Sequence, residues 1–459
     1  MSHEGRTDEV DADAADDLGG AGPSEFLLHD EVRQRAGGTS AARNGPGDPD
    51  PSTAGESPLP LSSECDLIGE IVESRWKAGS VFPREVVVQP ASTLGPDGVV
   101  SCGWRQIHLP ERYLTRVSGS VPTVDFELSA DQEALRSAAR DLLAGRSPMS
   151  VVRAATERGG VPDGDLWIAM SEQGWPGIAV SEADGGVGLG WVEAAIVLEE
   201  VGASLAPAPI LGHLVALEFL ATGERGPALL AGEQIAAVAP GVDGPVVCSP
   251  TADVLVTISD GGRLVGIDLQ GEPPAAEPAM DLTRQLGWVT LDGRACVDLG
   301  GDEAVTRFMD LGAVAYAAEM LGLAQRVLTL TVEYAKERVQ FGKPIGSFQA
   351  VKHRCADMLV DVEGMRSAVY WAAWCVSAGH ADASVAASTA KCWCSDASMR
   401  VMASALQVHG GVGFTWEHDL HLYLKRAHLD SISFGDAAAH RSRLASLLRE
   451  RVESGISVI

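Results

Sequence analysis

The chain has 459 residues, 46% of them apolar, which is enough to bury a large core divided among two to four domains. Its formal charge of −28, with 35 basic residues against 63 acidic ones, argues against nucleic acid as a partner, because phosphate neutralisation needs clustered lysine and arginine. The sequence contains no run of eighteen apolar residues, and its N-terminus lacks a basic segment followed by an apolar one. We therefore expect a cytoplasmic protein that does not insert into membranes.

The eight cysteines are spread along the whole chain, unlike those of a secreted disulfide scaffold, so we expect reduced thiols. Cys392 and Cys394 form the only close pair, and no ligand-spaced histidines accompany them. His418 and His421 are spaced as on one face of a helix, but no third ligand lies near them in the sequence. The sequence therefore predicts no metal site.

The first two stretches of the chain differ in composition. Residues 1–60 are rich in Asp, Glu, Gly, Ser and Pro with almost no aromatic side chains, so we expect a disordered acidic tail. Residues 61–122 contain short apolar runs at 86–88, 99–100 and 107–109, separated by proline and glycine. That pattern predicts a small β-rich extension.

A helical pattern follows and predicts an N-terminal helical domain over residues 123–235. Ser129 is the predicted N-cap of its first helix, with acidic residues in the following turn. A further helix is predicted over 193–205. The glycine-rich loop 185–190 before it is not a dinucleotide fingerprint, because no strand precedes it, and we expect a simple helix connection there.

Between residues 236 and 300 the apolar pattern changes from helical spacing to strands. The runs 254–258, 264–269 and 289–291 are rich in β-branched residues, and Gly261 and Gly262 form a turn between the first two. We expect a small β domain in this stretch.

Residues 301–459 are predicted to form a C-terminal helical bundle, beginning with a long helix over 303–337. A motif follows that helix directly. Arg338 can make forked, charge-assisted hydrogen bonds to a phosphate or adenine, and Phe341 offers a flat apolar face. This pair of residue types suits a nucleotide.

A second motif lies near the end of the bundle and suits the same kind of ligand. Gln407 can donate and accept hydrogen bonds through its amide. Gly410 and Gly411 let the backbone approach a pyrophosphate closely and expose their N–H groups to it. Taken singly, each motif is more simply interpreted as an ordinary helix end.

Three segments, namely 175–189, 334–349 and 407–415, resemble the acyl-CoA dehydrogenase family, and the resemblance extends over residues of about 126–450. It implies a mainly α fold with a small β domain: an N-terminal helical domain, a shortened middle β domain and a C-terminal four-helix bundle. It also implies FAD-dependent α,β-dehydrogenation of an acyl-CoA thioester to the 2-enoyl-CoA. An electron-transfer flavoprotein or another acceptor would then take the electrons.

The resemblance carries six residues over as FAD contacts. In this family such contacts commonly reach the flavin of a neighbouring subunit. The residues are Arg338, Phe341, Gln349, Gln407, Gly410 and Gly411.

The carboxylate that removes the substrate's α-proton in this family is missing at both matching positions. One position falls on Phe434 and the alternative one, used by some members, falls on Gly312. The reaction still needs a base, because the flavin supplies only the redox step. Glu319 is a weak substitute that we expect to be buried and paired with a basic group, while Asp310 and Asp436 are expected to point elsewhere. No catalytic residue is therefore assigned.

Two further departures concern the flavin face. Where the family has a Thr-Glu-Pro segment, residues 238–240 read Val-Ala-Pro. Where the family has Gly-Thr-Ser-Gln after the base, residues 435–438 read Gly-Asp-Ala-Ala. Both departures imply that the chain's own flavin site is incomplete.

These absences favour a subunit that works with a base-carrying acyl-CoA dehydrogenase partner. The chain resembles the subunit lacking the catalytic glutamate in hetero-oligomeric actinobacterial steroid side-chain acyl-CoA dehydrogenases, which implies a role in steroid or fatty acyl side-chain degradation. A homo-oligomeric enzyme with a relocated base is one alternative. A non-catalytic scaffold that binds a partner through residues 61–122 is another, and that extension resembles a degenerate zinc ribbon or OB-like unit in which every expected cysteine is absent.

Overall fold

The structure, a computed structural model, describes β1 (Val99–Cys102), β2 (Arg105–His108) and the continuous stretch 127–455. The predicted tail 1–60 and most of the predicted extension 61–122 lie outside the described residues. Within the extension, β1 and β2 pair antiparallel as a short hairpin. Both strands fall where apolar runs predicted extended chain.

The N-terminal helical part begins at α3 (Ala130–Arg146), and Ser129 is its N-cap, as predicted. Ser129 Oγ accepts a hydrogen bond from the Gln132 N–H (3.2 Å), and Gln132 Oε1 accepts one from the Ser129 N–H (3.0 Å), which completes a capping box. The loop 185–190 leads into α6 (Trp191–Ser204), so the predicted helix connection is confirmed. The other elements of this part are α4 (Met149–Glu157), α5 (Gly164–Glu172), η1 (Trp175–Gly177), η2 (Glu182–Asp184), α7 (Ile210–Leu220) and α8 (Gly226–Leu230).

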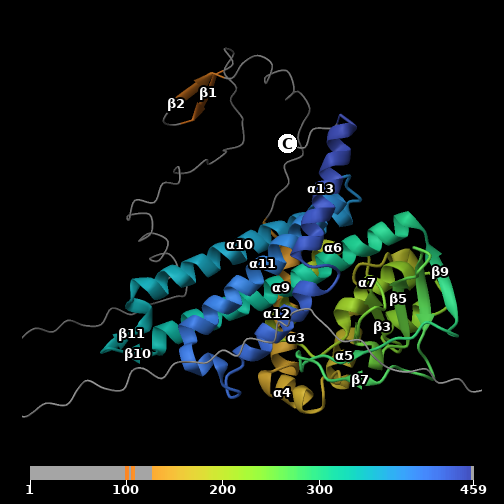
Figure 1. The fold of residues 1–459 in the computed structure, drawn as a ribbon, viewed down its shortest axis with the longest axis horizontal. Helices are drawn as coiled ribbons and strands as arrows, with labels where there is room; N and C mark the ends of the chain where they lie inside the picture. The colour runs from red at the N-terminus through yellow and green to blue at the C-terminus, as the bar shows by residue number, and fades with distance from the viewer. Residues whose placement is uncertain (1–98, 103–104, 109–126, 456–459) are drawn as a thin grey trace, which may run out of the picture. The chain divides into compact units, whose positions relative to one another are not determined.

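The strands that follow form two small sheets, drawn in green in Figure 1. The larger sheet has the order β3-β5-β6-β9, in which β3 runs parallel to β5 and the other pairs are antiparallel. The smaller sheet has the order β4-β8-β7 and is antiparallel. Strands β3, β5 and β6 are buried on both faces, which explains their continuous apolar runs. The bounds are β3 (Ala236–Ala239), β4 (Val246–Val247), β5 (Val254–Ile258), β6 (Leu264–Asp268), β7 (Ala276–Glu277), β8 (Leu286–Gly287) and β9 (Cys296–Gly300), with η3 (Ser249–Thr251) after β4.

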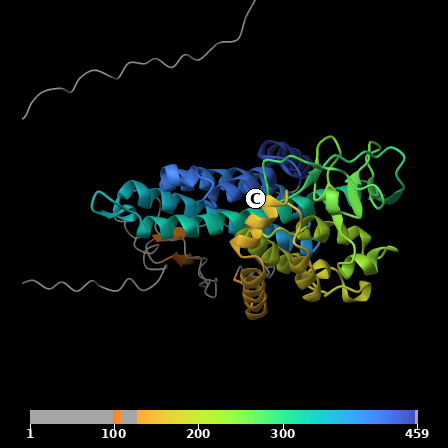
Figure 2. The same ribbon diagram turned by 90° about the horizontal axis from the view of Figure 1, so that it is seen from below.

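Long helices form the C-terminal bundle, and α9 runs from the sheet to the β10–β11 hairpin (Figures 1 and 2). Helices α9, α10 and α11 pack along one another, and α12 and α13 pack against α11. Among the described residues, no helix is long and apolar enough to cross a membrane. The bounds are α9 (Asp302–Glu337), β10 (Val339–Gln340), β11 (Lys343–Pro344), η4 (Ile345–Ser347), α10 (Gln349–Ser377), α11 (Ala383–His409), η5 (Gly410–Phe414), α12 (Leu420–Ile432) and α13 (Ala437–Glu453).

Helix α9 passes through the main hydrophobic core, which is continuous from α3 to α12. Its crossing with α6 requires glycine on both helices. A Cβ atom added at Gly322 would lie 1.8 Å from the Glu199 carbonyl oxygen, and one added at Gly202 would lie 2.2 Å from the Glu319 carbonyl oxygen. This close crossing fixes the axial position of α9, and with it the positions of Gly312 and Glu319.

Candidate functional site

Gly312 on α9 and Phe434 after α12, the two positions at which the resemblance would place a base and this chain has none, lie directly against each other. A Cβ atom added at Gly312 would lie 2.0 Å from Phe434 Cδ1 and 2.1 Å from Phe434 Cε1. Both distances are far shorter than a carbon–carbon contact. The Phe434 ring therefore occupies the space that any side chain at position 312 would need.

Phe434 belongs to an aromatic cluster formed with Phe308 and Tyr316, both on α9. Phe434 is 2% exposed, and its ring centroid lies 5.1 Å from that of Phe308 and 5.7 Å from that of Tyr316. An ionised carboxylate placed among these rings would lose its hydration, which is unfavourable. The surroundings of this position suit hydrocarbon and not a base.

The segment that carries Phe434 is held by two buried side chains. Phe434 has a left-handed φ of 56°, which a non-glycine residue adopts only where its surroundings impose it. Lys391 Nζ donates hydrogen bonds to the carbonyl oxygens of Ser431 (3.0 Å) and Gly435 (2.8 Å), and His440 Nε2 donates to that of Phe434 (2.9 Å). Burial lowers the pKa of Lys391 to about 8 and the pKa of His440 to about 4, so His440 is neutral near pH 7.

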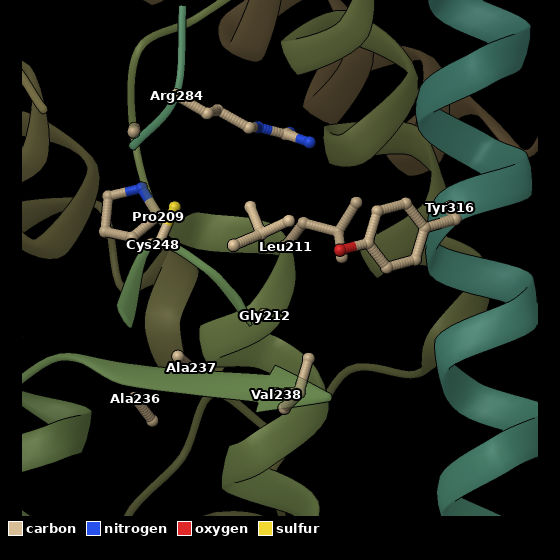
Figure 3. A pocket seen from close by; sticks show the side chains of 11 residues that line it. Pro209, Leu211, Gly212, Ala236, Ala237, Val238, Cys248, Arg284 and Tyr316 are labelled. Carbon is tan, nitrogen blue, oxygen red and sulfur yellow. The ribbon is translucent and has the colours of Figure 1, made fainter. Parts of the chain in front are cut away.

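Beside the aromatic cluster, the space between β3, the start of α7 and α9 is almost completely filled (Figure 3). Tyr316 from α9 and Leu211 from α7 point toward each other across it, and the Arg284 side chain reaches in along one wall. Val238, which begins the segment that replaces Thr-Glu-Pro, lines the same space. The remaining cavity measures about 10 Å³, room for roughly one water molecule, and is too small for a flavin ring.

A buried ionic cluster, formed by Asp281, Arg284, Glu319, Arg426 and Asp430, adjoins this space. Glu319 is fully buried, and its carboxylate binds the guanidinium groups of both Arg284 and Arg426, with Oε1 3.0 Å from Arg426 Nη1. Arg426 also donates to Asp281 (2.8 Å), and Arg284 donates to Asp430 (3.0 Å). The cluster connects the β7–β8 loop with α9 and α12.

The charges of the buried ionic cluster compensate one another when Asp430 holds a proton. Burial alone would raise the pKa of Glu319, but the two guanidinium groups outweigh it and lower that pKa. Burial and the neighbouring Glu319 raise the pKa of Asp430 well above its usual range. Glu319 is thus an ionised, doubly paired carboxylate with no exposed surface.

Asp310 and Asp436 also have structural partners. Asp310 lies 2.6 Å from Arg443 Nη1 and accepts a hydrogen bond from Ser384 Oγ at 2.6 Å. Asp436 is the N-cap of α13 and accepts a hydrogen bond from the Ala439 N–H at 2.8 Å. Both carboxylates are therefore held by structural partners.

The sequence analysis missed Arg284 and Arg426, the cationic members of the buried ionic cluster. The available signal was weak, because both residues lie in polar segments where exposed arginines are common. Only the fold brings Arg284 from the β7–β8 loop and Arg426 from α12 to the same carboxylate on α9.

An open groove lies at the other end of α9, and we call it the end groove. Arg338, Gly410 and Gly411 line one part of it, with a volume of about 540 Å³. Phe341 and Gln407 line an adjoining part of about 440 Å³. The two parts are continuous because both are bordered by Gln340, Ile345 and Val408.

The backbone at Gly410 and Gly411 in the end groove is uncovered, so a phosphate group could approach its N–H groups. Gly410 has a φ of 60°, and no atom of the described residues lies within 4 Å of a Cβ added at Gly410 or Gly411. Phe341 also has a left-handed φ, 54°, and its side chain is 92% exposed. Gln349, the sixth predicted contact, is the first residue of α10 and is exposed, but it does not line the groove.

The end groove and the cavity beside Phe434 differ in whether they fit a part of FAD. The end groove fits the anionic half of a dinucleotide, because it offers the Arg338 guanidinium, uncovered glycine backbone and the Phe341 ring. The filled space beside Phe434 does not fit the flavin ring. The end groove thus suits the anionic groups of a nucleotide, while the cavity beside the aromatic cluster is small.

His418 and His421 lie around the start of α12. The prediction that they share a helix face is wrong, because α12 begins at Leu420, so that His418 precedes the helix and accepts a hydrogen bond from the Leu420 N–H at 3.1 Å. In the part of the chain that the structure describes, no group of three or more His, Cys, Asp or Glu residues could hold a metal ion.

Family models match most of the chain after the extension. The acyl-CoA dehydrogenase N-terminal domain matches residues 129–223, and the acyl-CoA dehydrogenase C-terminal domain matches residues 300–448. The stretch between the two matches contains the small sheets.

The alignments with three similar proteins span nearly the whole length of each of them. The acyl-CoA dehydrogenase IpdE2 of Mycolicibacterium smegmatis is 39% identical over 307 residues, which span 66% of this chain and 93% of that protein. A structure described as a variant of the Tcur3481-Tcur3483 steroid ACAD is similar with a TM-score of 0.66 and 27% identity, covering 70% of this chain and 99% of that one. The ChsE4-ChsE5 complex from Mycobacterium tuberculosis is similar with a TM-score of 0.64 and 26% identity, covering 71% and 99%.

Proposed function

The chain belongs to the acyl-CoA dehydrogenase family, and on that premise we propose that it is the subunit without a base in a hetero-oligomeric acyl-CoA dehydrogenase. The enzyme would oxidise an acyl-CoA thioester to the 2-enoyl-CoA. Bound FAD would supply the acceptor for the hydride that leaves the substrate's β-carbon. An electron-transfer flavoprotein or another acceptor would then take the electrons from the complex.

One observation supports this proposal above all others: the Phe434 ring occupies the side-chain space of Gly312. Both positions at which the family holds a base are thereby closed in a single contact. The neighbouring cavity of about 10 Å³ leaves no room for a flavin ring with an acyl chain beside it. Both observations support a base and a place for the reacting atoms that are supplied by another chain.

The end groove supports the complementary half of the proposal. Arg338 and the N–H groups of Gly410 and Gly411 would bind the pyrophosphate of an FAD whose flavin ring lies in the partner subunit. Phe341 and Gln407 would contact the rest of its nucleotide half, with Gln349 at the start of α10 beside them. The left-handed φ of the exposed Phe341 is consistent with a ring presented to a partner rather than packed against its own chain.

The relatives support both a partner and a substrate class. One similar structure is a complex of ChsE4 with ChsE5, and another is described as a Tcur3481-Tcur3483 steroid ACAD. By analogy, we propose a base-carrying acyl-CoA dehydrogenase as the partner and the CoA thioester of a steroid-derived acid as the substrate.

Glu319 is not the base in this proposal. Both of its guanidinium partners would lose a buried counter-charge if it accepted a proton, and it has no surface through which a substrate could reach it. Its role is to join α9 to α12 and to the β7–β8 loop.

The proposal is tested by co-expressing the chain with a base-carrying partner and measuring bound FAD and turnover with an artificial electron acceptor. We expect a yellow complex with one FAD per two chains. Arg338→Ala in this chain should lower the bound FAD, whereas the matched change Arg263→Ala, at an exposed arginine of the β5–β6 turn, should leave it unchanged. Turnover per bound FAD should survive Glu319→Gln.

Two results would contradict the proposal. Turnover by the isolated chain would favour a homo-oligomer with a relocated base. A complex that forms without FAD and without activity would favour the scaffold alternative. A pull-down of the partner by the chain with and without residues 61–122 would then show whether that extension makes the contact.

A further inference from the structure

A second large groove lies between α3, α10 and α11, and none of its lining residues belongs to the end groove or to the aromatic cluster. Its volume is about 1010 Å³. Trp371 and Trp393 provide indole surface, and Arg136, Arg366 and Tyr370 form its polar wall. We call it the α3–α10 groove.

The indole of Trp393 is both exposed and fixed in place. A Cβ atom added at Gly364 would lie 2.8 Å from Trp393 Nε1, so the ring packs against α10 at a position where a side chain larger than that of glycine would collide with it. The Arg400 guanidinium lies 5.4 Å from the centre of the Trp393 ring and is itself held by two hydrogen bonds to Asp361, at 2.6 and 3.1 Å. Trp393 nevertheless remains 42% exposed.

The polar wall is preorganised around one buried carboxylate. Glu199 accepts hydrogen bonds from Arg366 (2.5 Å) and from the Tyr370 hydroxyl (2.6 Å), and Arg136 Nη2 lies 3.4 Å from it. Arg136 also donates to the Tyr370 hydroxyl at 2.8 Å. These contacts lock the side chains into one arrangement, so a ligand would lose little rotamer entropy here.

The rim of the α3–α10 groove is acidic. Glu133 and Glu363 contact the two arginines only at 3.4 and 3.5 Å, and their side chains are 56% and 57% exposed. The buried Glu199 adds a third carboxylate beside the two guanidinium groups of the polar wall. Fixed tryptophan, tyrosine and arginine side chains inside a charged rim are the composition of a protein-binding hot spot.

We infer that the α3–α10 groove binds an α-helical segment of the base-carrying partner subunit, with apolar side chains on Trp371 and Trp393 and Lys or Arg side chains against Glu133 and Glu363. This inference rests on the proposed function, because it assigns a second contact to the same partner. A second copy of this chain is a poorer occupant, since a chain with a formal charge of −28 would meet an acidic rim.

The test uses the flavin-containing complex. A photo-crosslinking benzoylphenylalanine replaces Ser367, an exposed residue on the groove wall, and the crosslinked peptides are identified by mass spectrometry. We expect crosslinks to a partner helix that carries Lys or Arg. Trp393→Ala should weaken the complex about 30-fold, as for the loss of an interface hot spot, while the matched change Trp288→Ala, at a tryptophan that is 54% exposed in another part of the chain, should have no effect.

The charge part of the inference has its own test. Glu133→Arg and Glu363→Arg should each weaken the complex and reduce its sensitivity to salt, while thermal unfolding of the isolated chain stays cooperative and shows that each variant still folds. Crosslinks to residues before Glu127 of this chain, crosslinks to a second copy, or an absence of crosslinks would each overturn the inference. In all three cases a complex that retains its FAD would leave the proposed function standing, whereas failure to form any flavin-containing complex would remove both.

Discussion

The contact between Gly312 and Phe434 predicts a specific pattern in a double-mutant cycle. Gly312→Ala places a methyl carbon at the position that lies 2.0 Å from the Phe434 ring, and such overpacking costs about 1–3 kcal/mol or more. Phe434→Ala removes a ring that is 2% exposed, and the resulting cavity costs about 3–5 kcal/mol. In the double variant the new methyl group enters the space that the ring has left.

The destabilisation of the double variant should therefore be smaller than the sum of the single ones, by about 1–3 kcal/mol. Denaturant unfolding of the four proteins, followed by tryptophan fluorescence, measures the difference. A control cycle pairs Phe434→Ala with Gly145→Ala, at a helical glycine of α3 around which no described atom lies within 4 Å of an added Cβ, and should be additive. Additivity to within about 0.5 kcal/mol in the main cycle would refute the steric contact and, with it, the argument that both base positions are closed.

Further predictions concern the surroundings of this contact. Glu319→Gln should destabilise the chain by about 3–5 kcal/mol in denaturant unfolding, because it leaves two buried guanidinium groups without their counter-charge. The control variant Asp298→Asn, at the exposed pair with Arg263, should change the free energy of unfolding by less than about 1 kcal/mol. Equal effects of the two changes would contradict the burial of the ionic cluster. Burial lowers the pKa of His440 to about 4 in the folded chain. Between pH 6.5 and 4 the unfolded chain therefore binds more protons than the folded chain, and the free energy of unfolding should fall as the pH falls through that range. His440→Gln, which keeps a donor for the Phe434 carbonyl, should remove up to about 1.4 kcal/mol of that loss per pH unit, and an unchanged slope would show that His440 is not buried neutral. Gly411→Val should lower bound FAD in the complex without changing unfolding of the isolated chain, whereas equal FAD content would exclude the end groove as the nucleotide site.

The fold was predictable where local signals agree with one another. The N-cap at Ser129, the long helix α9 and the strands β5 and β6 follow from capping residues and apolar spacing, which act over a few residues. The start of α12 was harder to predict, because His418 and His421 have helical spacing although only His421 lies in the helix. Helix ends depend on how the loop before them packs, and the sequence does not show that packing.

The site residues remain a prediction from motif spacing, and the structure adds the geometry. Motif spacing predicts Phe434 and Gly312 as substituted base positions, and motif order predicts Arg338 and Gly410 as nucleotide contacts. That the ring of Phe434 lies in the side-chain space of Gly312 depends on how α9 and the segment after α12 are placed in three dimensions. Likewise, Arg284 and Arg426 became visible as partners of Glu319 only when three separate segments were brought together.

The Gly312–Phe434 contact also bears on how such a chain can change over evolutionary time. A glutamate introduced at position 312 would collide with the Phe434 ring, and one introduced at position 434 would place a carboxylate among the rings of Phe308 and Tyr316. An intermediate with only a smaller residue at position 434 would have a cavity and no base. Under the proposed function, a chain whose base position is filled by this ring would therefore need more than one substitution to work without its partner.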